Sequence, residues 1–196
     1  MRQRPFDEYC KRAFDHISAS ILMDRELPDQ VFKGEWKYFR FCIFDDWILN
    51  KRFIPTLHKL LRIEGADVAC MWNAKQDASP QVAGASLVYL DSDTTPEEYD
   101  KLLDGDVPAK GWFYDFNRFV CMSDVGEWCI FGHRLEAIGI FGFRDEHTLQ
   151  KFSPTLEMIR AVPLTTQMEW GGDPFGRLIP KWSEGLLRNY ASQDKK

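Results

Sequence analysis

The sequence contains no hydrophobic run long enough to cross a membrane. Its most apolar stretch, residues 135–143, includes the charged residue Glu136 and is about half as long as a membrane-spanning helix. The first residues carry charges with no apolar segment behind them, whereas a secretory signal peptide needs such a segment. We therefore expect neither a membrane span nor a signal peptide, and we predict a cytoplasmic location.

The sequence also lacks cysteine motifs: its five cysteines show neither a Cys-x-x-Cys pair nor a Cys/His cluster with zinc-binding spacing. Cysteines within apolar runs of a cytoplasmic protein are usually reduced and buried. We expect this of Cys10, Cys42, Cys70, Cys121 and Cys129. One alternative stays open. If the chain reverses near Val125, Cys121 and Cys129 face each other across a hairpin and could form a disulfide under oxidising conditions.

Motifs that bind nucleotides or carry out catalysis are absent as well. The glycine-dense stretches 139–142 and 171–176 lack the spacing and the lysine of phosphate-binding loops, and no Gly-x-Ser-x-Gly sequence occurs. The four histidines stand alone, without a second metal ligand one helical turn away. Carboxylate pairs at 45–46 and 91/93 could bind a hard cation, but loops use such pairs more often for turns and helix caps. The sequence therefore predicts no cofactor, no metal and no catalytic residue, and we expect a protein that is not an enzyme.

Apolar and aromatic residues, by contrast, are plentiful. The 196 residues are 44% hydrophobic and 14% aromatic, which is enough to bury a core in a chain of one-domain length. The net charge is −5, and a negative protein without a basic face is a poor ligand for nucleic acid. The composition predicts one folded domain, residues 1–196, that does not bind nucleic acid.

The order of periodic segments predicts an α+β fold. Helical spacing covers residues 5–23, 53–63, 96–105 and 179–190, and one or two helical turns broken by Pro154 are expected within 145–160. Residues 94–98 offer a helix cap, a first-turn proline and first-turn acidic residues at the start of the helix expected at 96–105. Strand patterns occupy residues 35–49, 68–72, 85–91, 112–116, 118–123, 128–131 and 137–143. The last four are separated by tight turns, which is typical of an antiparallel meander. We expect this antiparallel β-meander sheet to be packed by the N-terminal and C-terminal helices.

The negative charge is concentrated in one segment. Residues 91–106 contain seven acidic residues and one lysine, a net charge of −6, so the rest of the chain sums to +1. Such a segment can simply be a solvated loop and helix, or it can attract a basic partner and speed association. The aromatic residues 112–116 follow directly and could anchor an interface or belong to the core. The predicted partner-binding residues are Asp91, Asp93, Glu97, Glu98, Asp100, Asp104, Asp106 and Trp112.

Residues 123–143 resemble a hairpin of small bacterial immunity proteins from contact-dependent and polymorphic toxin systems. In those proteins, a Trp-Cys/Ala-Ile-aromatic-Gly-x-Arg run ends one strand, and an acidic residue begins an apolar alternation in the next. The matching residues here are Trp128, Cys129, Ile130, Phe131, Gly132, Arg134 and Glu136. The resemblance implies a stoichiometric inhibitor that binds a cognate toxin protein and has no catalytic residue.

Two other functions remain open from the sequence. A small enzyme could assemble a site from residues far apart in the chain, with Asp45, Asp46, His133 and Glu136 as the best candidates. Alternatively, a structural or phage-derived subunit could self-associate through exposed aromatic side chains. The leading hypothesis is a cytoplasmic immunity protein that binds a basic toxin through its acidic segment.

Overall fold

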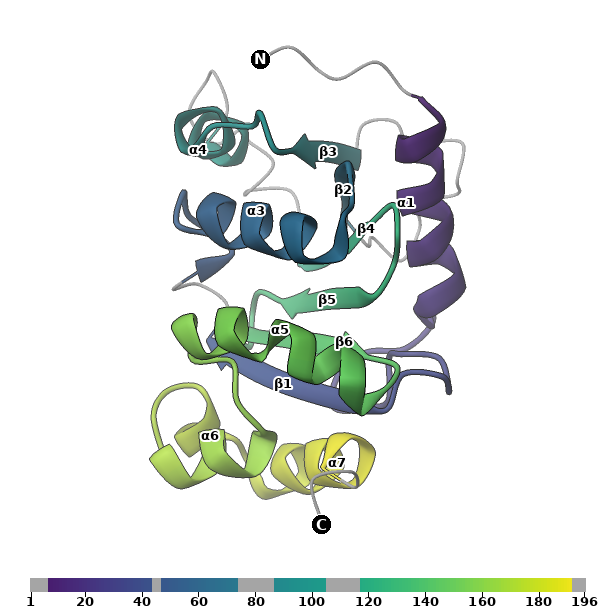
Figure 1. Ribbon diagram of the computed structural model, residues 1–196. Helices are drawn as coiled ribbons and strands as arrows, with labels where there is room; N and C mark the ends of the chain where they lie inside the picture. Colours follow the sequence, from purple (N-terminus) through teal and green to yellow (C-terminus); the bar gives the residue numbers. More distant parts are fainter. Residues whose placement is uncertain (1–6, 44–46, 74–86, 105–116, 192–196) are drawn as a thin grey trace.

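The computed structural model describes residues 7–43, 47–73, 87–104 and 117–191, which form an α+β fold as the sequence predicts. Within these ranges the strands pair in a fully antiparallel six-stranded sheet of order β1-β6-β5-β4-β2-β3 (Figure 1). The strands are β1 Tyr38–Ile43, β2 Val68–Asn73, β3 Leu87–Asp91, β4 Arg118–Ser123, β5 Trp128–His133 and β6 Ile138–Phe143. The predicted meander is confirmed for β4, β5 and β6, while the predicted strand at 112–116 lies outside the described residues.

Helices cover both faces of this sheet. One face carries α3 (Phe53–Glu64), α4 (Pro96–Asp104) and α5 (Glu146–Met158). The other carries α1 (Glu8–Ser20) and α7 (Pro180–Tyr190). The short α6 (Leu164–Trp170) and the 3-10 turn η3 (Phe175–Arg177) lie with α7 near β1, whereas α4 lies near β3 at the opposite end of the molecule (Figure 1). The N- and C-terminal helices therefore pack the sheet as predicted.

The two covered faces explain why the central strands lack a clear polar–apolar alternation. Every residue of β2, β4, β5 and β6 is buried. Alternate side chains serve different cores, so Ile130 packs with α3 and α5 while its neighbour Phe131 packs with α1 and α7. A sheet that is covered on both sides reads as a continuous apolar run.

The register between β4 and β5 corrects the predicted facing of two cysteines. Met122 pairs with Cys129, and Cys121 pairs with Ile130. The hairpin therefore reverses between Val125 and Gly126, and a one-residue shift moves a side chain to the opposite face of a sheet. Cys121 lies in the core beneath α3, and Cys129 lies in the core beneath α1. All five cysteines are free and buried, which confirms the prediction of reduced core thiols.

The prediction that Pro154 breaks a helix is wrong. Helix α5 runs without interruption from Glu146 to Met158, although a proline cannot donate the usual backbone hydrogen bond. Pro154 lies on the exposed side, whereas Leu149, Phe152 and Leu156 are buried in the core beneath α5. Burial of this apolar stripe outweighs the lost hydrogen bond.

No helix among the described residues has the length and apolar character needed to span a bilayer.

Candidate functional site

The acidic helix α4 is fixed to the protein by its apolar side. Tyr99 and Leu103, one turn apart, are both buried against the core. The Tyr99 hydroxyl donates a hydrogen bond of 2.6 Å to the carbonyl oxygen of Ile48, and its ring lies 5.6 Å from that of Phe53 in α3. Residues at positions 97 and 104 are exposed on the other side. The fold thus holds α4 firmly while presenting its acidic side to solvent.

Two of the predicted partner-binding carboxylates stabilise the start of α4. Asp91 accepts hydrogen bonds from the backbone of Asp93 and from the Thr94 hydroxyl. Glu98 accepts from the backbone N–H of Thr95 at 3.0 Å, and the Thr95 hydroxyl accepts from the backbone N–H of Glu98 at 3.2 Å. This reciprocal pair is a capping box, and its hydrogen bonds lower the pKa of Glu98. The sequence correctly predicts a cap here, and the cap gives Asp91 and Glu98 a structural role.

The other predicted acidic residues form what we call the acidic α4 surface: Asp93, Glu97, Asp100 and Asp104. None of these four carboxylates forms an ion pair with any residue that the structure describes. Asp93, Glu97 and Asp104 are exposed, and Asp100 is half-buried. Asp106 and Trp112 lie outside the described residues, so their part in binding stays a prediction.

The residues proposed for an enzyme are only partly brought together. His133 ends β5 and is buried, with its ring 6.1 Å from that of Trp182 in α7. Glu136 lies in the following turn, and Asp45 and Asp46 lie outside the described residues. Burial lowers the pKa of His133, against the opposing effect of Glu136 and Glu26. Within the described part of the chain, no cluster of three His, Cys, Asp or Glu side chains could hold a metal ion.

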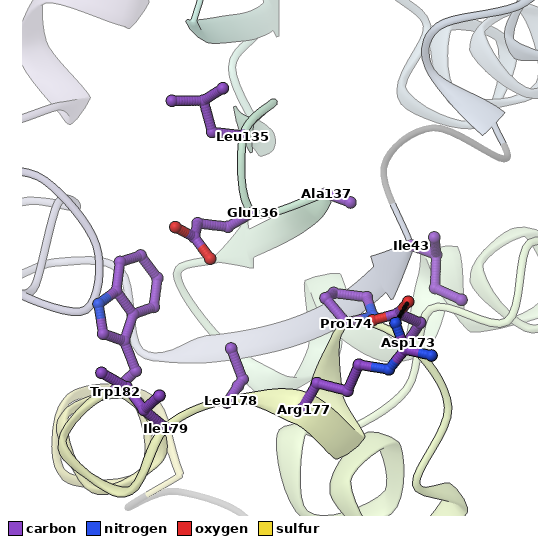
Figure 2. A pocket seen from close by; sticks show the side chains of 10 residues that line it. All are labelled: Ile43, Leu135, Glu136, Ala137, Asp173, Pro174, Arg177, Leu178, Ile179 and Trp182. Atoms are coloured by element: carbon purple, nitrogen blue, oxygen red, sulfur yellow. Dashed lines mark ion pairs between the residues drawn. The ribbon is translucent and has the colours of Figure 1, made fainter.

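Sequence reasoning missed a surface hollow at the β1 end of the sheet, which we call the Glu136–Trp182 hollow. It has a volume of about 700 Å³ and opens between the β5–β6 turn and the segment that leads into α7 (Figure 2). Its lining comes from four places in the chain: Ile43, Leu135, Glu136, Ala137, Asp173, Pro174, Arg177, Leu178, Ile179 and Trp182. A smaller hollow of about 260 Å³ shares Ile43 and Asp173 with it. An apolar Leu135 in a hairpin turn is the one sequence signal that could have indicated this surface.

The backbone at this hollow is strained. Ala137 has φ 51°, in the left-handed region where a side chain other than glycine costs energy. Its N–H donates to the carbonyl of Arg134, which closes the turn between β5 and β6. Non-glycine residues in such conformations gather at binding and catalytic sites, where surrounding structure holds them. The turn geometry thereby fixes Glu136 at the mouth of the hollow.

No protein-family model, curated protein or solved structure matches this chain. A function for this protein is therefore argued from the charges and contacts of its own residues.

Proposed function

We propose that this protein is a cytoplasmic bacterial immunity protein that binds a cognate toxin protein and neutralises it through the acidic α4 surface. One observation carries the proposal: four carboxylates on and beside α4 lack ion-pair partners among the described residues, while the helix itself is anchored by buried Tyr99 and Leu103. Asp91 and Glu98, by contrast, accept hydrogen bonds that cap the start of α4. Unpaired carboxylates on a rigid helix are available to a partner.

The chemistry of this surface favours a basic protein partner. Clustered negative charge accelerates the encounter with a positive surface and discriminates against acidic proteins. A toxin that cleaves or modifies nucleic acid needs a positive surface that binds phosphates. Carboxylates held along a helix can occupy that surface and exclude the nucleic acid. The hairpin β5–β6, whose sequence resembles immunity proteins, adds a second and independent line of support.

Charge reversal on α4 tests the proposal. The triple variant Glu97→Lys, Asp100→Lys, Asp104→Lys leaves the capping residue Glu98 intact, so α4 should remain folded. The binding partner in this experiment is the protein encoded beside this one, and the measurement is its association rate constant. For the wild type, we expect a fall of about tenfold or more between about 0.05 M and about 0.5 M NaCl. The variant should associate slowly at both salt concentrations.

A matched control carries the same change of net charge elsewhere. Glu157, Glu169 and Glu184 are exposed on α5, α6 and α7, and their reversal to lysine should leave most of the association rate intact. Equal slowing in both triple variants would show that only net charge matters and would overturn the proposal that the acidic α4 surface binds the partner.

Protection of cells that express the neighbouring gene tests the immunity function itself, and loss of protection is expected only for the α4 variant.

A further inference from the structure

The Glu136–Trp182 hollow joins an acidic group and an aromatic ring that are far apart in the sequence. Glu136 projects from the β5–β6 turn and its carboxylate points toward the indole of Trp182, which α7 presents from the other side (Figure 2). Pro174, just before η3, and Leu178, between η3 and α7, add apolar lining to the hollow. A carboxylate facing an indole across an open hollow is the arrangement that binds organic cations, because the ring face and the carboxylate both attract positive charge.

Glu136 is the unpaired charge of this hollow. The other two charged residues in the lining, Asp173 and Arg177, pair with each other at 2.9 Å. Glu136 forms no ion pair or hydrogen bond with any residue that the structure describes. The lining residues that the structure describes therefore carry one net negative charge, and a bound cation would neutralise it.

The charged residues behind Trp182 do not supply that cation. Arg118, at the end of β4, donates to the carbonyl oxygen of Arg25 at 3.0 Å and lies 3.5 Å from the Glu26 carboxylate. His133 packs against Trp182, and burial lowers its pKa, which disfavours its charged form. Arg118 is thus paired within the protein, Arg177 is paired with Asp173, and the charged form of His133 is disfavoured.

The rim of the hollow is apolar and exposed. Leu135 is 76% exposed and Ile179 is 61% exposed, so both side chains are accessible to a partner. The volume of about 700 Å³ is much larger than a guanidinium group requires and falls in the range of sites that hold larger ligands. A ligand that fills it carries apolar groups on both sides of its positive charge.

We propose that the Glu136–Trp182 hollow binds an arginine side chain of an extended polypeptide segment, with the flanking apolar residues of that segment against Leu135 and Ile179. The planar guanidinium can stack on Trp182 and donate two parallel hydrogen bonds to Glu136, which an ammonium group cannot do equally well. This proposal does not depend on the toxin-binding function, because the hollow lies at the β1 end and α4 lies at the β3 end of the sheet (Figure 1).

Peptide titration followed by NMR tests this site on the full-length protein. The probes are acetyl-leucyl-arginyl-leucine amide, the same peptide with neutral citrulline in place of arginine, and free methylguanidinium. The signal is the indole N–H of Trp182, assigned by its disappearance in Trp182→Phe. We expect the arginine peptide to shift this signal saturably and to bind about tenfold or more tightly than the citrulline peptide.

Two variants identify the residues. Glu136→Gln should reduce binding of the arginine peptide to the level of the citrulline peptide, while Glu184→Gln, on α7 but outside the hollow, should bind like the wild type. Absence of saturable shifts, equal binding of the two peptides, or unchanged binding by Glu136→Gln would each overturn the proposal. Equally tight binding of methylguanidinium would also overturn it, because the ligand would then be a free cation. A failed peptide titration leaves the α4 charge-reversal result unaffected, so the two proposals fail separately.

Discussion

The guanidinium of Arg12 in α1 donates a hydrogen bond of 3.2 Å to the carboxylate of Asp124, which lies 112 residues away in the β4–β5 turn. The second oxygen of Asp124 accepts from the backbone N–H groups of Asp67 and Val68 at 3.0 and 3.1 Å. One carboxylate thus joins the first helix, the start of β2 and the central hairpin. Asp124 is almost wholly buried, whereas the Arg12 side chain is 50% exposed.

This contact predicts unequal effects for the two residues. Asp124→Ala leaves two backbone N–H groups and Arg12 without their acceptor, and should lower the free energy of unfolding by about 3 kcal/mol. Arg12→Ala keeps the two backbone hydrogen bonds and removes a half-exposed partner, so a loss of about 1 kcal/mol is expected. Urea unfolding measures both values. Equal losses would contradict the central role of Asp124.

Glu64 predicts a specific pH dependence of stability. It ends α3 and accepts a hydrogen bond from the backbone N–H of Glu127, and burial raises its pKa from 4.5 to about 7. Between pH 4.5 and about pH 7, Glu64 is therefore mostly protonated in the folded protein but mostly ionised in the unfolded chain. The resulting stabilisation is complete below pH 4.5 and is lost as the pH rises toward 7.

The variant Glu64→Gln isolates this effect. It keeps an oxygen acceptor for Glu127 and has no titrating proton, so its stability relative to the wild type should increase with pH. The increase should be on the order of 2 kcal/mol between about pH 4.5 and about pH 7.5. Other groups titrate in both proteins and cancel in the difference, which urea unfolding across this range measures. A difference independent of pH would show that Glu64 ionises normally.

The strained backbone at Ala137 predicts a stabilising substitution. Ala137→Gly relieves the left-handed conformation at φ 51° but adds freedom to the unfolded chain, and the balance should stabilise the protein by about 0.5 kcal/mol. Ala19→Gly is the matched control, because Ala19 is exposed within helix α1. There, glycine should destabilise by about 1 kcal/mol. Thermal unfolding should move the two variants in opposite directions, and destabilisation by both would contradict strain at Ala137.

The five buried cysteines predict slow thiol chemistry. Burial raises the pKa of Cys70, Cys121 and Cys129, which disfavours the reactive thiolate. In the native protein, an aromatic disulfide reagent should therefore react only at the rate of unfolding, and in denaturant it should titrate all five thiols. Diamide treatment followed by mass spectrometry should find no Cys121–Cys129 disulfide, because the two side chains lie on opposite faces of the sheet. A disulfide formed without unfolding would contradict this register.

Local signals in the sequence determine much of the secondary structure. Thr95, Pro96 and Glu98 specify the start of α4, and the structure confirms the reciprocal hydrogen bonds that such a cap requires. The helical spacing of residues 5–23 predicts a helix that the structure confirms from Glu8 to Ser20. Asp7 caps this helix by accepting from the N–H of Cys10. These features depend on residues within one or two turns of each other, so one sequence suffices to recognise them.

Strand register and the Glu136–Trp182 hollow were decided only by the tertiary structure. A strand that is buried on both faces has no polar–apolar alternation to show which side chains point to which face. The pairing of Cys121 with Cys129 that the sequence suggested is therefore wrong by one residue. Glu136 and Trp182 line one hollow only because the chain passes the edge strand β1 after α5 and packs α7 against the other face of the sheet. Helix caps and amphipathic spacing depend on residues that are close in the sequence. Strand register and surface hollows depend on packing between distant segments, because that packing maximises the apolar area buried over the whole chain.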